Sequence, residues 1–181
     1  TTARTSRLDP DNRLLSRGPR HRLDAEVLRD QALSVGGLLQ RHMGGPGVRP
    51  YQPLGVWKAV AFAGSNTREY KVDAGTALHR RTLYTFWKRT SPPASMAAFD
   101  APTREQCTVR RERTNTPLQA LVLMNDTQYV EAARGLAQQV VAQAGSDGDR
   151  EAWLFRRALV RPPGGADVQE LVESFAEFRK H

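Results

Sequence analysis

From Thr116 onward, apolar residues recur at the three- and four-residue spacing of amphipathic helices, and helix-capping residues separate the runs. Thr116 followed by Pro117 is typical of a helix start, and Asp126 is suited to cap the next helix. We expect the helix between them to be largely buried. The pattern predicts four helices, over about residues 118–124, 127–144, 149–161 and 167–178. Residues 115–181 are therefore expected to form a small helical bundle.

The preceding residues give weaker signals. Asp24 is suited to cap an amphipathic helix that we expect to end near Met43, before a Gly-Gly-Pro sequence. Residues 46–76 are rich in glycine, proline and aromatic residues and predict a long structured loop, which either has a function or covers the core. Residues 78–89 fit a helix by spacing and a strand by propensity, and we favour the helix.

Two shorter segments complete the expected organisation. Residues 1–22 combine six arginines with two prolines and predict an extended or loosely ordered lead-in, while residues 94–99 are long enough for one helical turn. We therefore expect a mostly α protein, an irregular multi-helix domain with a long loop region and a C-terminal bundle. The predicted units are a single domain over 1–181, with a lead-in over 1–22, a basic helix-and-loop region over 23–114 and the bundle over 115–181. The hydrophobic core of the whole domain is predicted to contain Leu28, Val35, Leu121, Val130, Leu136, Val140, Leu159 and Phe175.

Charge is unevenly distributed along the chain. The net charge is +8, but residues 1–114 carry 20 Lys and Arg against 10 Asp and Glu, whereas residues 115–181 carry 7 against 9. The basic surplus therefore lies in the first part. Arginine outnumbers lysine 23 to 4. This excess indicates either many bidentate contacts between arginine and carboxylate or phosphate groups, or simply a codon bias in the source genome.

Several common kinds of site have no sequence support. The single cysteine, Cys107, excludes an internal disulfide and a CxxC pair, and the four histidines lie too far apart for a local metal motif. Residues 44–47 lack the lysine of a phosphate-binding loop. No apolar run approaches the roughly 20 residues of a membrane span. We therefore expect neither metal nor cofactor in this chain, and no membrane span.

A polar cluster immediately precedes the helix that begins after Thr116. Its members are Asp100, Arg104, Cys107, Arg110, Arg111, Arg113 and Asn115. Three arginines and Asn115 are predicted to form a polar staple that anchors residues 83–107 to the bundle, with Asp100, Glu105 or backbone carbonyls as partners. Arg111→Ala is then expected to lower thermal stability. Because the arginines could lower the pKa of Cys107, an uncharacterised enzyme with a site at residues 100–115 remains an alternative, although a small buried thiol fits Cys107 better.

A second alternative is binding of a polyanion by the basic face of residues 80–113. Interleaved Tyr84, Trp87 and Phe99 fit base stacking combined with backbone neutralisation, as in proteins that bind single-stranded nucleic acid. The absence of a recognised nucleic-acid motif disfavours that partner. An acidic or sulfated polysaccharide is the other candidate.

Two stretches carry a family resemblance: LYTFWKRTSPPASMAAFDAP (83–102) and CTVRRERTNTPLQALVLMND (107–126). They resemble the domain of unknown function 1553 family (DUF1553), the planctomycete cytochrome-c-associated proteins. The resemblance extends upstream through SRGPRHRLDAEVLRDQAL (16–33) and downstream through FRRALVRPP (155–163), so it covers nearly the whole chain.

The resemblance implies an architecture rather than an activity. Members are large exported proteins, which implies a periplasmic or extracellular location, and this domain lies beside cytochrome c modules and carbohydrate-related domains. Haem would then belong to other parts of the polypeptide, since this chain has no CxxCH. The lead-in resembles the middle of the family domain, which implies that the chain is the C-terminal portion of a longer domain. We expect a scaffold or interaction module whose partners are other domains of the same polypeptide.

Overall fold

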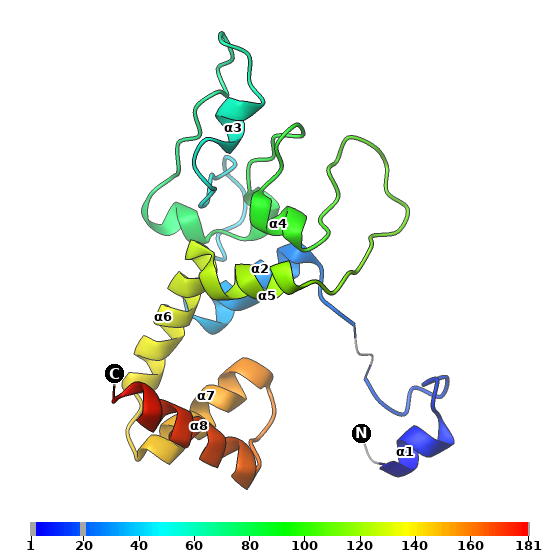
Figure 1. Cartoon of the computed structure of the whole chain (residues 1–181), viewed down its shortest axis with the longest axis vertical. Coiled ribbons are helices and arrows are strands. Elements are labelled where there is room, and N and C mark those ends of the chain that lie inside the picture. Colours follow the sequence, from blue (N-terminus) through cyan, green and yellow to red (C-terminus); the bar gives the residue numbers. More distant parts are fainter. Residues whose placement is uncertain (1–2, 19–20, 181) are drawn as a thin grey trace.

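The fold is mostly α, as predicted. A computed structural model describes residues 3–18 and 21–180, and within these the chain forms eight α-helices and two short 3₁₀ helices but no sheet (Figure 1). Residues 1, 2, 19 and 20 of the predicted lead-in, and residue 181 of the bundle, lie outside the described part. The elements are α1 (Ala3–Leu8), α2 (Ala25–Val35), α3 (Val56–Ala59), η1 (Gly75–His79), η2 (Thr82–Tyr84), α4 (Ala94–Ala98), α5 (Pro117–Asn125), α6 (Thr127–Val141), α7 (Asp147–Leu159) and α8 (Gly165–Phe178).

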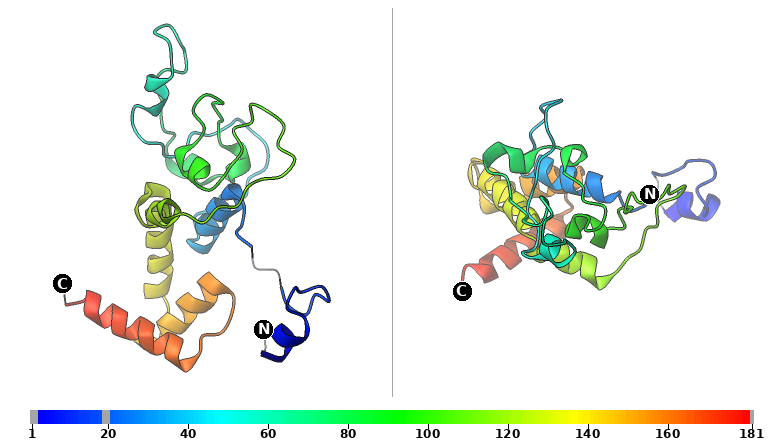
Figure 2. Two further views of the ribbon diagram at one scale, coloured as in Figure 1. Left: turned by 45° about the vertical axis from the view of Figure 1, so that its right-hand side comes forward. Right: turned by 90° about the horizontal axis from the view of Figure 1, so that it is seen from above.

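Helix α6 is the central element of the fold. Helices α2, α5 and α7 pack against it, α8 packs on α7, and α4 contacts both α2 and α5 (Figures 1 and 2). The end of α2 meets α6 where Gly36 lies against Gly135 and Ala132, and a Cβ atom on either glycine would collide with backbone atoms of the other helix segment. This close approach explains why both positions are glycine.

The main core lies where α2, α4 and α6 meet. Ala25, Met96, Phe99 and Tyr129 are buried there, and Leu28 packs against them as predicted. The prediction of burial is wrong for four other residues, since Leu121, Val130, Leu159 and Phe175 are each exposed. Val35, Leu136 and Val140 are partly buried.

The prediction that the helix after Thr116 is largely buried is also wrong. Helix α5 packs on α4 and α6, and its outer side chains are exposed, with Leu118 57%, Leu121 55% and Met124 72% accessible. Periodicity indicated the helix correctly, but it could not show that neighbouring elements cover so little of the helix surface.

A buried arginine forms a second, polar centre. Arg29 of α2 is 2% exposed. Its guanidinium donates to Gln128 Oε1 of α6 at 2.6 Å, to the carbonyl oxygens of Leu78 and Arg80 at 2.7 and 2.9 Å, and to Thr82 Oγ1 at 3.1 Å. Burial lowers the pKa of Arg29, and the nearby Asp30 carboxylate opposes that shift. The bonds satisfy a charge that would otherwise be costly to bury.

The Arg29 contacts explain why the helix predicted over 78–89 is wrong. That segment contains η1 and η2 followed by irregular chain. The Arg29 guanidinium donates to the carbonyl oxygens of Leu78 and Arg80. Asp30 Oδ1 accepts from both the backbone N–H and the hydroxyl of Thr82, each at 2.7 Å. These side chains bind backbone groups that a continuous helix would need.

Two further boundaries differ from the sequence predictions. Helix α2 ends at Val35, not near Met43, because Gly36 and Gly37 follow it and Gly37 has φ of 73°. The lead-in is not uniformly extended, since α1 forms over Ala3–Leu8. In Figures 1 and 2 this helix stands apart from the other elements.

The remaining helices follow the sequence signals closely. The single turn predicted over 94–99 is α4. Asp126 caps α6 by accepting from Gln128 N–H at 3.0 Å, and Ser146 caps α7, whose first residue, Asp147, lies two residues before the predicted start. None of the helices in the described ranges has the length and apolar character that a membrane crossing requires.

The long loop over 46–76 contains the short helix α3 and a small aromatic cluster. Trp57 is buried, with its ring centroid 4.6 Å from that of Tyr70 and 5.5 Å from that of Phe86. Lys88 lies over the Trp57 ring at 5.0 Å. These contacts favour the interpretation that Trp57 and Tyr70 cover a core, whereas Phe62 of the same loop is exposed.

Candidate functional site

The predicted polar cluster lies in the long connection between α4 and α5, which we call the arginine loop (residues 100–116). Its two ends are joined at Asp100, which has a left-handed backbone with φ of 61°. The Asp100 carboxylate accepts from the backbone N–H of Thr114 at 2.7 Å and from its hydroxyl at 2.9 Å. These bonds close the loop and engage the Asp100 side chain within it.

Arg111 connects the arginine loop to the start of α2. Its two terminal nitrogens donate to the two carboxylate oxygens of Glu26, at 2.7 and 3.1 Å, and Asp24 lies 3.7 Å away. Burial alone would raise the pKa of Glu26, but the Arg111 hydrogen bond and the charges of Arg111 and Arg104 lower it below its ordinary value. The same hydrogen bond raises the pKa of Arg111. This bidentate pair is the geometry in which arginine binds carboxylates most specifically.

Two more arginines of the loop converge on the same carboxylates. Arg113 lies 3.6 Å from Asp24, and Arg104 lies 4.0 Å from Glu26 while its guanidinium covers the Trp87 ring at 4.2 Å. The ion-pair partners are therefore the acids at the start of α2 and not Asp100 or Glu105, which the sequence suggested. An acidic residue in the first turn of a helix is a recognisable sequence feature, since acids are favoured there. It did not identify Glu26 as the partner of Arg111, because the two residues are 85 positions apart.

Arg22, just before α2, was not singled out from the sequence, although it reaches the other end of the loop. It donates to Asn115 Oδ1 at 2.7 Å and also bonds the Thr114 carbonyl and Gln119 Oε1. Gln119 in turn accepts from Thr116 N–H at 3.1 Å, which completes the capping box of α5. The contact ties residue 115 and the start of α5 to the segment before α2.

The other two members of the predicted cluster are exposed. Cys107 is solvent-exposed, so the expectation of a small buried thiol is wrong. His79, the histidine nearest to Cys107 in the sequence, pairs with Glu131 of α6, with 3.2 Å between Nε2 and Oε2. Arg110 is exposed, and its guanidinium has no hydrogen bond or ion pair with residues 3–18 or 21–180. The hypothesis of an enzyme site at residues 100–115 stays a prediction.

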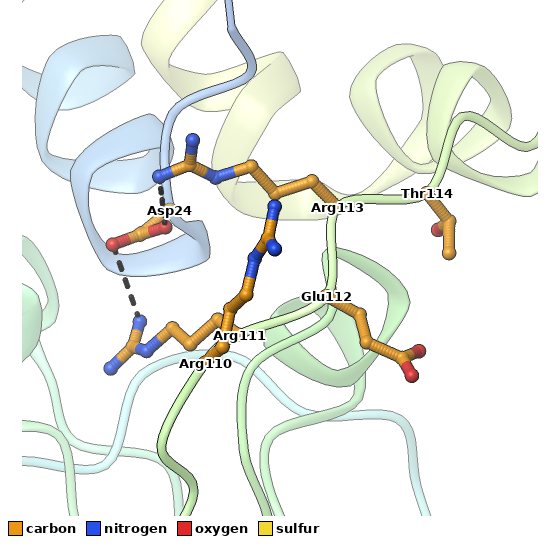
Figure 3. Close-up of a pocket in the computed structure, with 6 residues that line it drawn as sticks. All are labelled: Asp24, Arg110, Arg111, Glu112, Arg113 and Thr114. Carbon is orange, nitrogen blue, oxygen red and sulfur yellow. Dashed lines mark ion pairs between the residues drawn. The ribbon is translucent and has the colours of Figure 1, made fainter.

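Two open cavities flank the backbone of residues 110–112. The larger, about 760 Å³, is lined by Asp24 and residues 110–114, and the smaller, about 440 Å³, lies on the Asp100 side. Figure 3 shows Arg111 and Arg113 joined to Asp24 by ion pairs, whereas Arg110 is not joined and Glu112 points away from Asp24. No group of three potential metal-ligating side chains occurs in the described part of the chain.

Comparison with known proteins identifies a family. The family model described as PSD1, protein of unknown function (DUF1553), matches residues 1–175. No curated protein and no solved structure matches the chain.

Proposed function

This chain belongs to the DUF1553 family of proteins of unknown function, and from that membership we propose that it acts as an interaction module of a larger polypeptide. Its partners would be other domains of that polypeptide, beside the cytochrome c and carbohydrate-related domains that the family resemblance implies. The same resemblance supports a periplasmic or extracellular location as part of this proposal. The module would serve as a scaffold that holds those domains in place.

The observation that supports the proposal is the exposed apolar face of α5. Leu118, Leu121 and Met124 lie at three-residue spacing along one side of this short helix, and all three are exposed, as is Leu123 on another side. Isolated apolar residues are normal on a surface, but a group of large ones on one element is typical of a protein interface. The backbone of α5 is anchored at its start by the capping box and Arg22, so the face is presented on a fixed element.

The arginine loop is consistent with a scaffold role as well. Arg111 binds both oxygens of Glu26, and Asp100 binds Thr114. These contacts hold the loop in position immediately before α5. A surface that is ordered before binding loses less conformational entropy when a partner docks.

Methionine oxidation tests the proposal, because the three methionines form a matched set. Met124 lies on the proposed face and is 72% exposed, Met43 is 65% exposed elsewhere, and Met96 is 3% exposed in the core. The chain alone and the longer polypeptide would each be treated with dilute hydrogen peroxide and followed by mass spectrometry. We expect Met124 to be oxidised readily in the chain alone and at least several-fold more slowly in the longer polypeptide. Met43 should react in both and Met96 slowly in both; equal oxidation of Met124 in the two samples would refute the proposal.

A leucine pair provides a second test. Leu121 lies on the proposed face, whereas Leu54 is 99% exposed on the loop before α3. Leu121→Gln should restore rapid oxidation of Met124 in the longer polypeptide by weakening the interface. Leu54→Gln should leave Met124 protected from oxidation in the longer polypeptide.

A further inference from the structure

Arg110 differs from its neighbours in having no intrachain partner. Arg111 donates two hydrogen bonds to Glu26, and Arg113 shares Asp24 with Arg111 at distances of 3.6 and 3.7 Å. Arg110, by contrast, lines both cavities, and its guanidinium is unpaired within the described residues. All five of its N–H donors, and most of those of Arg113, are therefore available to a ligand.

The charge around the larger cavity favours an anion. Three arginines (Arg104, Arg111 and Arg113) pair with two carboxylates, Asp24 and Glu26, and Arg110 lines the larger cavity as an additional positive charge. Glu112 also lines this cavity, but its side chain points away from Asp24 in Figure 3. Guanidinium groups bind carboxylate, sulfate and phosphate oxygens in bidentate geometry, so Arg110 and Arg113 are suited to hold one anionic group each.

The lining of the cavity also limits the class of ligand. Its volume of about 760 Å³ is large enough for several linked sugar units, and its lining consists of charged residues and one threonine. Single-stranded nucleic acids need aromatic faces on which bases can stack. The aromatic residues that the sequence offered for stacking are engaged elsewhere. Phe99 is 4% exposed, and Arg80 and Arg104 cover the rings of Tyr84 and Trp87 at 3.9 and 4.2 Å.

We infer that the cavity beside Arg110 and Arg113 is a binding site for the anionic groups, sulfate esters or carboxylates, of an acidic polysaccharide. In this proposal Arg111 does not bind the ligand. It holds the arginine loop against Glu26 so that Arg110 and Arg113 face the cavity. The inference is independent of the α5 face, since it rests on a different surface of the molecule.

The experiment compares two exposed arginines in binding measurements at physiological ionic strength. Heparin serves as the sulfated probe and polygalacturonate as the carboxylated one, with single- and double-stranded DNA of similar charge alongside. Arg110→Ala should weaken polysaccharide binding about tenfold, the effect of losing one charged hydrogen-bonding group. The matched control is Arg156→Ala on α7, an exposed arginine outside the cavity that removes the same charge; it should change affinity less than twofold.

Four outcomes would overturn the inference. Equal weakening by Arg110→Ala and Arg156→Ala would mean that the probe responds only to total charge. Tighter binding of either DNA than of both polysaccharides would assign the site to nucleic acid. No binding at physiological ionic strength would exclude the site, since purely electrostatic association is lost as salt rises. A lowered melting temperature of Arg110→Ala would give that side chain a structural role instead.

Discussion

The basic helix-and-loop region (23–114) and the C-terminal bundle (115–181) are organised by contacts of different range. In the first, Arg29 bonds groups 49 to 99 positions away, and Arg111 binds Glu26 across 85 positions. In the second, Ser146 and Asp149 cap α7 through a contact of three positions, and Asp126 caps α6 through one of two. Buried or half-buried arginines thus specify the irregular region, whereas local signals specify the helices of the bundle.

Removing Arg29 should have the largest effect. Arg29→Met keeps much of the side-chain volume but leaves the carbonyls of Leu78 and Arg80 and the Gln128 amide oxygen without their donor. Each buried acceptor left without its donor costs about 1–3 kcal/mol, so the free energy of unfolding should fall by at least that amount. Urea denaturation followed by circular dichroism would measure this loss. Hydrogen exchange should increase in η1 and η2 more than in α7 and α8; a uniform increase would contradict the difference between the two regions.

Removing a cap in the bundle should have a smaller and more local effect. Ser146→Ala deletes the hydroxyl that accepts from Asp149 N–H, which costs about 1 kcal/mol. Hydrogen exchange should increase in the first turn of α7 and remain unchanged at η1 and η2. Ser174→Ala, at an exposed position within α8, is the control and should change stability by less than about 0.5 kcal/mol. Exchange that rises equally in both regions would show that the bundle does not depend on its local caps.

Acid should weaken the contact between the arginine loop and α2. The folded-state pKa of Glu26 lies below its ordinary value of 4.5, so the contribution of Glu26 is fully present above that pH and is lost as pH falls through the lowered pKa. Glu26→Gln should therefore be less stable than the parent at pH 7, by about 1 kcal/mol, and the difference should shrink toward pH 3. Melting temperatures of both proteins across this range would test it. Parallel curves would show that Glu26 is not responsible.

The same contrast explains what the sequence could predict. Capping residues and apolar spacing identified α5, α6, α7 and α8 to within a few residues, because those signals act over one or two turns. The failure at residues 78–89 came from Arg29 and Asp30, whose bonds to that segment bridge about 50 positions and leave no local pattern. The sequence singled out the arginine loop, but its partners Asp24 and Glu26 were not predicted for the same reason.

Burial was harder to predict than helix position. The apolar residues of α5 fit a helix equally well whether or not another element covers them, and periodicity alone gave no sign that Leu118 and Leu121 would be exposed. Cys107 is similar, since its small apolar side chain suggested burial and the arginine loop leaves it exposed. Both errors concern residues whose environment depends on packing between distant segments.

A double-mutant cycle between Arg111 and Glu26 tests the central claim most directly, namely that Arg111 anchors the arginine loop while its neighbour Arg110 remains available. Urea denaturation of Arg111→Ala, Glu26→Gln and the double variant should give a coupling of about 1 kcal/mol, as expected for a half-exposed bidentate pair. The parallel cycle with Arg110→Ala should give a coupling near zero. A coupling near zero for Arg111, or an equal coupling for both arginines, would contradict the account.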